Sequence, residues 1–296
     1  MTQTEFSTIG IIGKYSDAGV GASVMALSDH LCQKGLRVII DEGTAELLTE
    51  HHLETCNRAE LGQLCDLAIV VGGDGTLLNA ARSLSGFDVP LVGINLGHLG
   101  FLTDISPDTM LQHMDAILEG DYLTEERYLL HTRIFREGEQ INESEAFNDV
   151  VVHKWHVARM IQLETYIDDE FVSRLRADGV IVSTPTGSTA YALSAGGPIL
   201  HPSLKAVVMV PICPHSMSNR PIVIEDHHQI EILFCDNLHD NAQVTCDGQI
   251  AFSLMAGDRI RIMKKERPIR LIHPAQHNHY ELLRAKLRWA ENPPQA

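Results

Sequence analysis

Short apolar runs alternate with segments of helical periodicity through about the first 125 residues. Four of these runs are bounded by polar or turn residues and predict buried strands: 8–13, 37–41, 67–71 and 91–95. Helices are predicted over 21–34 and 76–84, where apolar residues recur at helical spacing. A third helix is expected to begin at Ser106-Pro107 and to end near Gly120. Strands that alternate with helices predict a mostly parallel sheet covered on both faces.

From about residue 129 the apolar positions alternate in short stretches separated by turn residues, a pattern typical of antiparallel strands. In the stretch 160–168, Ile161, Leu163, Thr165 and Ile167 fall on one face. The expected strands are 130–136, 147–153, 160–168, 230–234, 243–246, 259–263 and 269–273. The last segment, 279–290, carries its leucines roughly on one stripe and predicts a helix.

These patterns predict two domains and a C-terminal element. We expect an α/β N-terminal domain, Rossmann-like with a mostly parallel sheet, over 1–126. A mainly β, sandwich-like C-terminal domain would cover 127–275, and a C-terminal helix and tail, 276–296, would return to the first domain. A chain of 296 residues, 44% hydrophobic and 21% charged, is long enough for two cores.

The charge balance argues against a nucleic-acid partner. Lys and Arg total 23 and Asp and Glu total 39, so the formal net charge is 23 − 39 = −16. This sign is wrong for a protein that binds nucleic acid through phosphate contacts. An anionic small molecule would also have to be held by local donors that overcome the field of the whole chain.

Neither a membrane nor an oxidising compartment is indicated. No apolar run approaches the roughly 20 residues that span a bilayer, and the amino terminus lacks the basic and apolar regions of a secretory signal. The six cysteines form no Cys-x-x-Cys pair. We therefore expect a cytoplasmic protein without disulfides and without membrane association.

A glycine-rich loop, Gly72-Gly73-Asp74-Gly75-Thr76, joins the predicted strand 67–71 to the predicted helix 76–84. Its glycines let the backbone approach a ligand and adopt a positive φ, and the amides and dipole of a helix start favour an anion such as phosphate. It lacks the Gly-Lys-Ser/Thr ending of a Walker A loop. It also has Leu78 where the last glycine of Gly-x-Gly-x-x-Gly would stand.

Asp74 is the most informative residue of this loop. A carboxylate repels the phosphate that the amides attract, so Asp74 indicates a metal ion, a sugar hydroxyl, or a hydroxyl that must lose its proton. The alternative is that Asp-Gly forms a tight turn without further function. The loop alone leaves both interpretations open.

A second polar loop, Thr-Pro-Thr-Gly-Ser-Thr-Ala-Tyr at 184–191, lies between a predicted strand and a short helix. Its hydroxyls and amides suit a ribose, an adenine edge or a phosphate. Ser188 or Thr189 could cap the helix unaided. Because a cap requires one hydroxyl and this loop has several, the ligand-binding interpretation is favoured.

The chain resembles the NAD kinase family, in particular members from Gram-negative bacteria. The resemblance rests on five blocks in the family's order and spacing, and they span the chain: Gly-Gly-Asp-Gly-Thr at 72–76, Gly-Ile-Asn-Leu-Gly-His-Leu-Gly-Phe-Leu at 93–102, Asn148-Asp149, Pro-Thr-Gly-Ser-Thr-Ala-Tyr at 185–191 and Gly-Gly-Pro at 196–198. The fourth block distinguishes this family from the lipid kinases that share the glycine-aspartate loop.

The resemblance implies an ATP-dependent NAD kinase. Such an enzyme transfers the γ-phosphoryl group of ATP to the 2′-hydroxyl of the adenosine ribose of NAD and forms NADP and ADP, with Mg²⁺ or another divalent cation on the triphosphate. The family combines an α/β domain with a β domain, and the coenzyme lies in the cleft between them. Homo-oligomers, dimers or tetramers, are common, and a neighbouring subunit borders the site.

The resemblance also implies roles for individual residues. Asp74 would be the general base that accepts the proton of the ribose hydroxyl. The family usually has Asn-Glu where this chain has Asn148-Asp149. The coenzyme-binding residues implied are Gly72, Gly73, Gly75, Asn148, Asp149, Arg159, Arg176, Asp178, Thr189, Ala190, Tyr191, Ala192, Leu193, Ser194, His215 and Gln249.

The 16 histidines do not predict a metal site. The pairs His51-His52, His227-His228 and His277-x-His279 lie in polar segments that we expect to be exposed. They also lack the cysteine or carboxylate spacing of a closed zinc site. We therefore expect surface histidines and no protein-bound metal.

Two other functions share part of these features. A lipid kinase would have the glycine-aspartate loop but would need an apolar pocket or a basic membrane-facing surface, which this acidic chain lacks. A nucleotide sensor without catalysis would retain the binding loops but would have no need of a carboxylate at Asp74. Phosphorylation of a lipid but not of NAD would indicate the first, and NAD binding without turnover the second.

Overall fold

The computed structural model describes residues 6–15, 18–48, 51–97, 99–155, 159–235 and 242–289. The chain divides into two compact units. The first unit combines residues 1–126 with 269–296, and the second covers residues 127–268. Each unit is described by itself.

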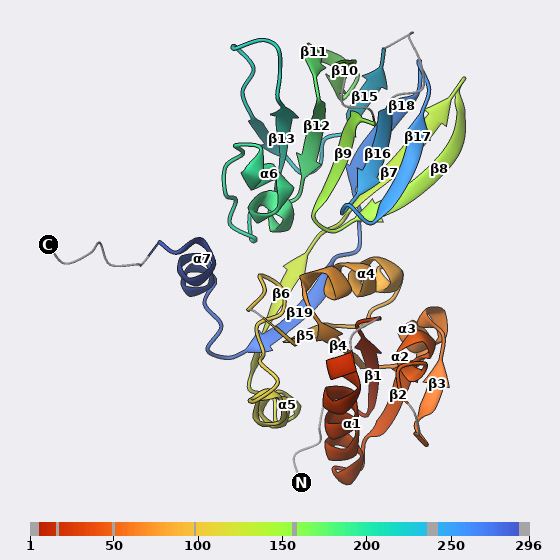
Figure 1. Ribbon diagram of the computed structural model, residues 1–296, viewed down its shortest axis with the longest axis vertical. Coiled ribbons are helices and arrows are strands. Elements are labelled where there is room, and N and C mark those ends of the chain that lie inside the picture. The colour runs from red at the N-terminus through yellow and green to blue at the C-terminus, as the bar shows by residue number, and fades with distance from the viewer. Residues whose placement is uncertain are drawn as a thin grey trace, which may run out of the picture. The chain divides into compact units, whose positions relative to one another are not determined.

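The first unit is built on a seven-stranded sheet with the order β3-β2-β1-β4-β5-β19-β6. The strands from β3 to β19 pair in parallel with their neighbours, as expected (Figure 1). Their bounds are β1 (Thr8–Gly13), β2 (Arg37–Asp41), β3 (Glu54–Cys56), β4 (Leu67–Gly72), β5 (Leu91–Asn95), β6 (Tyr122–Arg127) and β19 (Ile269–Pro274). Every residue of β4 and β5 is buried, because helices cover both faces of the sheet.

The helices of the first unit are α1 (Ala18–Gln33), α2 (Glu42–Ala45), α3 (Arg58–Leu64), α4 (Asp74–Leu84), α5 (Met110–Leu118) and α7 (His279–Leu287). Apolar residues of α1 and α5 form one core with alternate residues of β1, β4 and β5. On the other face, the backbone of β1 lies against Leu61 of α3 at Gly10, and that of β5 against Leu77 of α4 at Gly93. The sheet is therefore sandwiched between two helical layers.

Four short elements of the first unit were not predicted, namely β3, β6, α2 and α3. Helix α3 has only seven residues, and its interior glycine hides the helical signal. A capping box at Asn57 and Glu60 holds its start. Gly62 is needed because a Cβ there would lie 2.4 Å from the ring of Phe87.

Strand β19 differs from expectation. The pattern at 269–273 predicted a strand of the β-rich half, but the structure pairs Leu271 and Ile272 in parallel with β5 of the first unit. Leu271, Ile272 and His273 are consecutive buried residues, which suits a strand covered on both faces better than a half-exposed one.

Two helix ends also differ. Helix α5 begins at Met110, not at Ser106-Pro107, since those two residues form turns whose carbonyls bond the amides of Thr109 and Met110. Helix α7 ends at Leu287, where Arg288 adopts a left-handed φ of 57°. The predicted end at residue 290 lies outside the described residues.

The second unit consists of two antiparallel six-stranded sheets, which confirms the mainly β, sandwich-like domain. One has the order β11-β10-β15-β18-β7-β8 and contains β7 (Leu130–Arg136), β8 (Glu139–Ala146), β10 (Ile161–Ile167), β11 (Glu170–Ala177), β15 (Ile230–Phe234) and β18 (Arg259–Lys264). The other has the order β14-β13-β12-β9-β16-β17 and contains β9 (Asp149–Lys154), β12 (Gly179–Ser183), β13 (Ala206–Ile212), β14 (Ile222–Glu225), β16 (Ala242–Cys246) and β17 (Ile250–Leu254).

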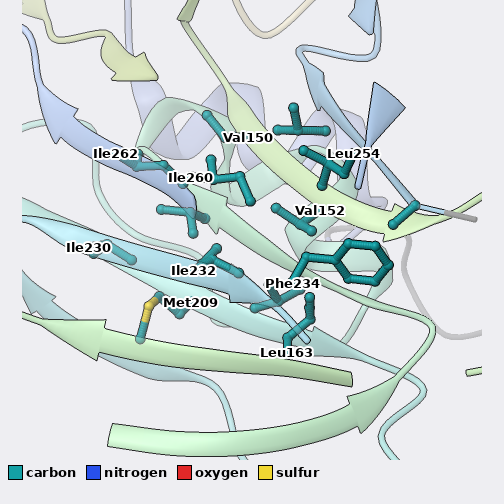
Figure 2. Packing of buried hydrophobic residues seen from close by; sticks show 14 of the residues in the cluster. Val150, Val152, Leu163, Met209, Ile230, Ile232, Phe234, Leu254, Ile260 and Ile262 are labelled. Carbon is teal, nitrogen blue, oxygen red and sulfur yellow. The ribbon is translucent and has the colours of Figure 1, made fainter. Parts of the chain in front are cut away.

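Inward-facing residues of both sheets form one core (Figure 2). Val150 and Val152 of β9 meet Leu163 of β10 and Ile232 and Phe234 of β15. Buried and partly exposed residues alternate along β7 and β16, as the sequence pattern of these strands predicted. In β10, Leu163, Glu164 and Thr165 are consecutive buried residues. A 3₁₀ turn (Thr186–Thr189) and α6 (Tyr191–Ser194) follow β12.

Among the described residues, no helix is long and apolar enough to cross a membrane. The structure describes all six cysteines, and none of them forms a disulfide.

The core of the second unit generates a stability prediction. Phe234→Ala removes a ring with 0% exposure and leaves a cavity between the sheets, so it should lower the free energy of unfolding by about 3–5 kcal/mol. Phe171→Ala, at a ring that is 58% exposed, is the matched control and should cost about 1 kcal/mol or less. Urea unfolding followed by circular dichroism measures both, and equal losses would contradict this assignment of the core.

Candidate functional site

The glycine-rich loop joins β4 to α4. Gly73 is the N-cap residue in extended conformation, and Asp74 is the first residue of the helix. The expectation that these glycines adopt positive φ is wrong, since Gly72, Gly73 and Gly75 all lie outside that region. Gly72 is required for a different reason, because a Cβ there would lie 2.4 Å from Oγ1 of Thr76.

The carboxylate of Asp74 is held by the loop that follows β5. Its Oδ2 accepts from the amide of Phe101 at 2.8 Å. Its Oδ1 accepts from the amides of Leu102 and Thr103 at 3.0 and 3.2 Å, and from Oγ1 of Thr103 at 3.1 Å. Hydrogen bonds to an ionised acceptor are stronger than neutral ones, so this half-buried side chain is fixed in one orientation.

Gly100 makes this arrangement possible. A Cβ at residue 100 would lie 2.0 Å from Oδ1 of Asp74 and 2.3 Å from Oγ1 of Thr103. The amide of Gly100 also donates to the carbonyl of Thr103 at 3.0 Å, which closes the loop around the carboxylate. The block at 93–102, known from the sequence only by its resemblance, thus contains the glycine on which the position of Asp74 depends.

The four donors are divided unequally between the two oxygens. Oδ1 receives three hydrogen bonds and Oδ2 receives one. A carboxylate oxygen has two lone pairs, so Oδ2 retains the capacity to accept from a ligand hydroxyl. The arrangement can orient a hydroxyl group and accept its proton.

The second unit contains a cavity of about 470 Å³. Its wall is made of residues from β9, β16, the turn after β16 and the loop before α6. The lining residues are Asn148, Asp149, Val151, His153, Ala190, Tyr191, Gln243, Thr245, Asp247 and Gly248. Four of them, Asn148, Asp149, Ala190 and Tyr191, are among the residues predicted from the sequence.

Asp149 is a buried carboxyl in this wall, with 4% of the residue exposed. Burial, together with the negative charge of Asp247, raises the pKa of Asp149 to about 7. Near neutral pH this carboxyl therefore exchanges between its acidic and ionised forms, and it can donate or accept a hydrogen bond.

Asp247 was not predicted as a site residue. It lies in the hairpin turn between β16 and β17, where Asp247 and Gly248 both have left-handed φ angles, of 52° and 62°. Its carboxylate accepts from the consecutive amides of Phe147, Asn148 and Asp149 at 3.0, 2.7 and 3.2 Å. The Asp-Gly pair, a common two-residue hairpin turn, was the available signal in the sequence.

His153 and Gln243 form another pair that sequence reasoning missed. Nδ1 of His153 lies 2.9 Å from the carbonyl of Lys154, and its Nε2 lies 2.9 Å from Nε2 of Gln243. The first contact assigns the proton to Nδ1, so Nε2 accepts from the Gln243 amide. Among the described residues, Oε1 of Gln243 is buried without a hydrogen-bond partner, and it is free to accept from a ligand.

The hydroxyls of the loop at 184–191 serve mainly the protein itself. Thr184 donates to the carbonyl of Phe147 at 2.7 Å, and Ser188 donates to that of Pro185 at 2.6 Å. A Cβ at Gly187 would lie 2.1 Å from the carbonyl oxygen of Asn148. The loop is thus fastened to the segment that carries Asn148, and it faces the cavity through Ala190 and Tyr191.

The other predicted residues of the second unit lie elsewhere. Asp178 forms an ion pair with Lys154 at 2.6 Å, and the amide of His215 donates to the carbonyl of Arg176 at 2.9 Å. Ala192 is fully buried in the core. Thr189 and Leu193 are half-buried, whereas Arg159, Arg176, Ser194, His215 and Gln249 are exposed.

One expectation about the histidines is wrong. The side chain of His277 is 6% exposed, because it packs against His273 with the two rings stacked at a centroid distance of 4.1 Å. The side chain of His227, in contrast, is 63% exposed as expected. Burial of His277 arises from its contact with β19, which no local pattern at 277–279 reveals.

The two sites together are typical of an enzyme that acts on a nucleotide-sized ligand with hydroxyl groups. A cavity of this volume suits a small molecule, and an oriented carboxylate at a helix start suits proton transfer from a hydroxyl. Comparison with known proteins defines the class further.

A model of the ATP-NAD kinase N-terminal domain matches residues 9–122, and one of the ATP-NAD kinase C-terminal domain matches residues 147–274. The chain is 49% identical to the NAD kinase of Pseudomonas putida (strain W619) over 285 residues, 96% of each chain. It is also 49% identical to the NAD kinase of Teredinibacter turnerae over 287 residues, 97% of this chain and 98% of the relative. The chain belongs to the NAD kinase family.

Two solved structures share the fold. An NAD kinase from Archaeoglobus fulgidus in complex with ATP has a TM-score of 0.74 and 27% identity, and the match covers 95% of this chain and 98% of that one. A yeast NADH kinase complexed with NADH has a TM-score of 0.88 and 24% identity, with coverage of 100% and 94%. These matches confirm the expected fold class, an α/β N-terminal domain and a mainly β C-terminal domain with a C-terminal helix.

Gly100→Ala tests the contact with Asp74. The added methyl group overlaps Oδ1 of Asp74, so the variant should lose about 1–3 kcal/mol of unfolding free energy. Gly97→Ala is the control in the same loop, because nothing lies within 4 Å of a Cβ there, and it should change stability by less than about 0.5 kcal/mol. Thermal unfolding measures the stability of both variants. Identical unfolding midpoints would contradict the close approach of residue 100 to Oδ1 of Asp74.

The raised pKa of Asp149 predicts a pH dependence of stability. Between its ordinary value of 3.8 and about 7, the folded chain retains a proton that the unfolded chain has lost, so this group makes the protein less stable as pH rises. Asp149→Asn removes the effect. Relative to the unaltered chain, the variant should gain about 2–3 kcal/mol between pH 5 and pH 8. Urea unfolding at both pH values provides the measurement, and parallel pH profiles would contradict the prediction.

Proposed function

We propose that this protein transfers the γ-phosphoryl group of ATP to the 2′-hydroxyl of the adenosine ribose of NAD and releases NADP and ADP. The observation that carries the proposal is the fixed carboxylate of Asp74 at the start of α4, held by the amides of residues 101–103. Membership of the NAD kinase family, with curated relatives of 49% identity over nearly the full length, supports the same reaction.

Asp74 is proposed as the general base. Its hydrogen bonds orient the carboxylate, and a carboxylate is in general a weak base. A weak base suffices when the transition state is loose, since the ribose hydroxyl loses its proton late in phosphoryl transfer. Fixed orientation is the larger contribution, because alignment of the reacting groups supplies much of the catalysis of this reaction.

The cavity of the second unit is proposed to bind a nucleoside part of the coenzyme. The carboxyls of Asp149 and Asp247 lie in its wall and would repel the pyrophosphate, whereas ribose hydroxyls can donate to them. Oε1 of Gln243 is suited to accept from an amino or amide group of the ligand. This adds Asp247, His153 and Gln243 to the coenzyme-binding residues expected from the resemblance.

A divalent cation, Mg²⁺ or a related ion, is proposed to enter as part of the ATP substrate. The residues of the loop do not fit a protein-bound Mg²⁺, because the oxygens of Asp74 already accept four hydrogen bonds from the chain. Mg²⁺ requires several oxygen ligands in near-octahedral geometry, and the triphosphate provides them. The cation is therefore treated as substrate.

The quaternary structure and the location are further proposals. We infer a homo-oligomer, dimer or tetramer, from the family resemblance, with the exposed His215 as the residue that would border a neighbouring site. Light scattering of the purified chain tests this, and a monomeric mass would refute it. A cytoplasmic location is consistent with six cysteines that form no disulfide within the described residues.

The experiment that tests the reaction measures NADP formation from ATP, Mg²⁺ and NAD, coupled to an NADP-specific dehydrogenase. Asp74→Asn should lower kcat by about 10² to 10⁴, the range for a positioned base, and leave NAD affinity nearly unchanged. Asp88→Asn, at a side chain that is 80% exposed in the same unit, is the matched control and should retain full turnover.

Each result has a distinct meaning. Near-normal turnover of Asp74→Asn would remove Asp74 from the role of base while leaving the reaction intact. If the unaltered chain binds NAD in calorimetry but forms no NADP, the protein is a nucleotide sensor and the kinase proposal fails. Phosphorylation of a lipid in place of NAD would identify the lipid kinase alternative.

A further inference from the structure

Three residues of the first unit converge at a place that takes no part in the proposed reaction. Asp104 follows directly on the loop that holds Asp74, His273 lies in β19, and His277 lies between β19 and α7. Oδ2 of Asp104 is 2.9 Å from Nδ1 of His273 and 2.6 Å from Nδ1 of His277. One ligand atom from each of the three residues lies within 4.8 Å of the others.

The cluster is buried, with side-chain exposures of 10% for Asp104, 2% for His273 and 6% for His277. Hydrogen bonds within the cluster leave several of its buried polar atoms without a partner. If both rings are neutral and donate from Nδ1, the Nε2 atoms of both histidines are buried acceptors without a donor. Oδ1 of Asp104 is likewise buried without a partner in the described part of the chain. Each unsatisfied buried acceptor destabilises the folded chain, because it has lost its hydrogen bonds to water.

The three ligand atoms also lie where one ion could contact them all. The two rings are stacked at a centroid distance of 4.1 Å, and Oδ2 of Asp104 lies within hydrogen-bond distance of both Nδ1 atoms. A cation bound to the two Nδ1 atoms and to Oδ2 would be shared among these three ligand atoms.

The tautomer that metal binding requires also fits the surroundings of His273. When Nδ1 of each ring binds an ion, each Nε2 carries the proton and becomes a donor. Nε2 of His273 then faces Oε2 of Glu125 at 3.7 Å, on the side of the ring opposite Asp104. A carboxylate behind a metal-bound histidine is a usual feature of such sites, because it fixes the ring and increases its basicity.

We propose that Asp104, His273 and His277 bind one divalent transition-metal ion of the Zn²⁺ class. Two imidazoles and one carboxylate suit Zn²⁺, Co²⁺ or Ni²⁺ better than Mg²⁺ or Ca²⁺, which prefer oxygen ligands only. The ion would connect Asp104, which follows the loop that holds the Asp74 carboxylate, with β19 and with the segment before α7. It would therefore stabilise the first unit. This proposal does not depend on the proposed reaction.

A second cluster, Glu225, His227 and His228, does not support the same inference. The side chains of Glu225 and His227 are 73% and 63% exposed, and His228 is already paired with Asp168 at 2.5 Å. Its polar atoms are satisfied by water or by Asp168. His228→Ala therefore provides a matched control that removes a histidine outside the proposed site.

The test uses the full chain, stripped with a chelator and then dialysed against Zn²⁺. We expect one Zn²⁺ per chain by elemental analysis, a dissociation constant raised at least about 100-fold in His277→Ala, and unchanged binding in His228→Ala. Zn²⁺ should also raise the thermal unfolding midpoint of the unaltered chain but not that of His277→Ala. Equal Zn²⁺ binding by the unaltered chain and His277→Ala, or none by either, would overturn the proposal.

Co²⁺ provides a measurement that needs no variant of the site. Bound to two imidazoles and a carboxylate in place of Zn²⁺, it should give visible absorption bands of a low-coordinate complex, and added Zn²⁺ should abolish them. If His277→Ala does not fold, Glu125→Gln replaces it as the test variant. It should weaken metal binding by about 10- to 100-fold, and unchanged binding in Glu125→Gln together with a featureless Co²⁺ spectrum would refute the site.

Discussion

The hydrogen bonds from the consecutive amides of Phe101, Leu102 and Thr103 to the carboxylate of Asp74 are the central interaction of the first unit. Strands β4 and β5 are parallel neighbours, so the segments that leave their carboxyl ends lie at the same edge of the sheet. One segment begins α4 with Asp74, and the other turns back at Gly100, where only a glycine leaves room for the carboxylate. The side chain that we propose as the general base is thus oriented by backbone amides, which move less than side chains do.

The second unit also contains an aspartate whose carboxylate accepts hydrogen bonds from three consecutive amides. Asp247 also gathers three consecutive amides, those of residues 147–149, and so fixes the segment that carries Asn148 and Asp149. Its charge and the burial of Asp149 together raise the pKa of the Asp149 carboxyl to about 7. The side chain of Asp149 thus lies close to Asp247 in the wall of the cavity.

Much of the fold follows from local patterns. The buried runs of β1, β2, β4 and β5 and the alternation along β7 and β16 could be predicted because the hydrophobic pattern of the sequence agrees with burial in these strands. Short elements such as α3 were not, since seven residues with an interior glycine carry little periodicity. Strand β19 was assigned by its place in the chain to the β-rich half, whereas its pairing with β5 depends on a partner about 180 residues away.

The sequence alone determined the family and the alternation of strands and helices, because motif and spacing are local properties. It also predicted Asp74, Asn148, Asp149 and Tyr191 as site residues, and that remains a prediction. Tertiary structure decided what these residues touch. It assigned the hydroxyls of Thr184 and Ser188 to the backbone, and it brought Asp247, His153 and Gln243 to the cavity wall. It also buried His273 and His277 against Asp104. Such contacts join residues that are distant along the chain, and only the pairing and packing of the strands bring these residues within hydrogen-bond distance of each other.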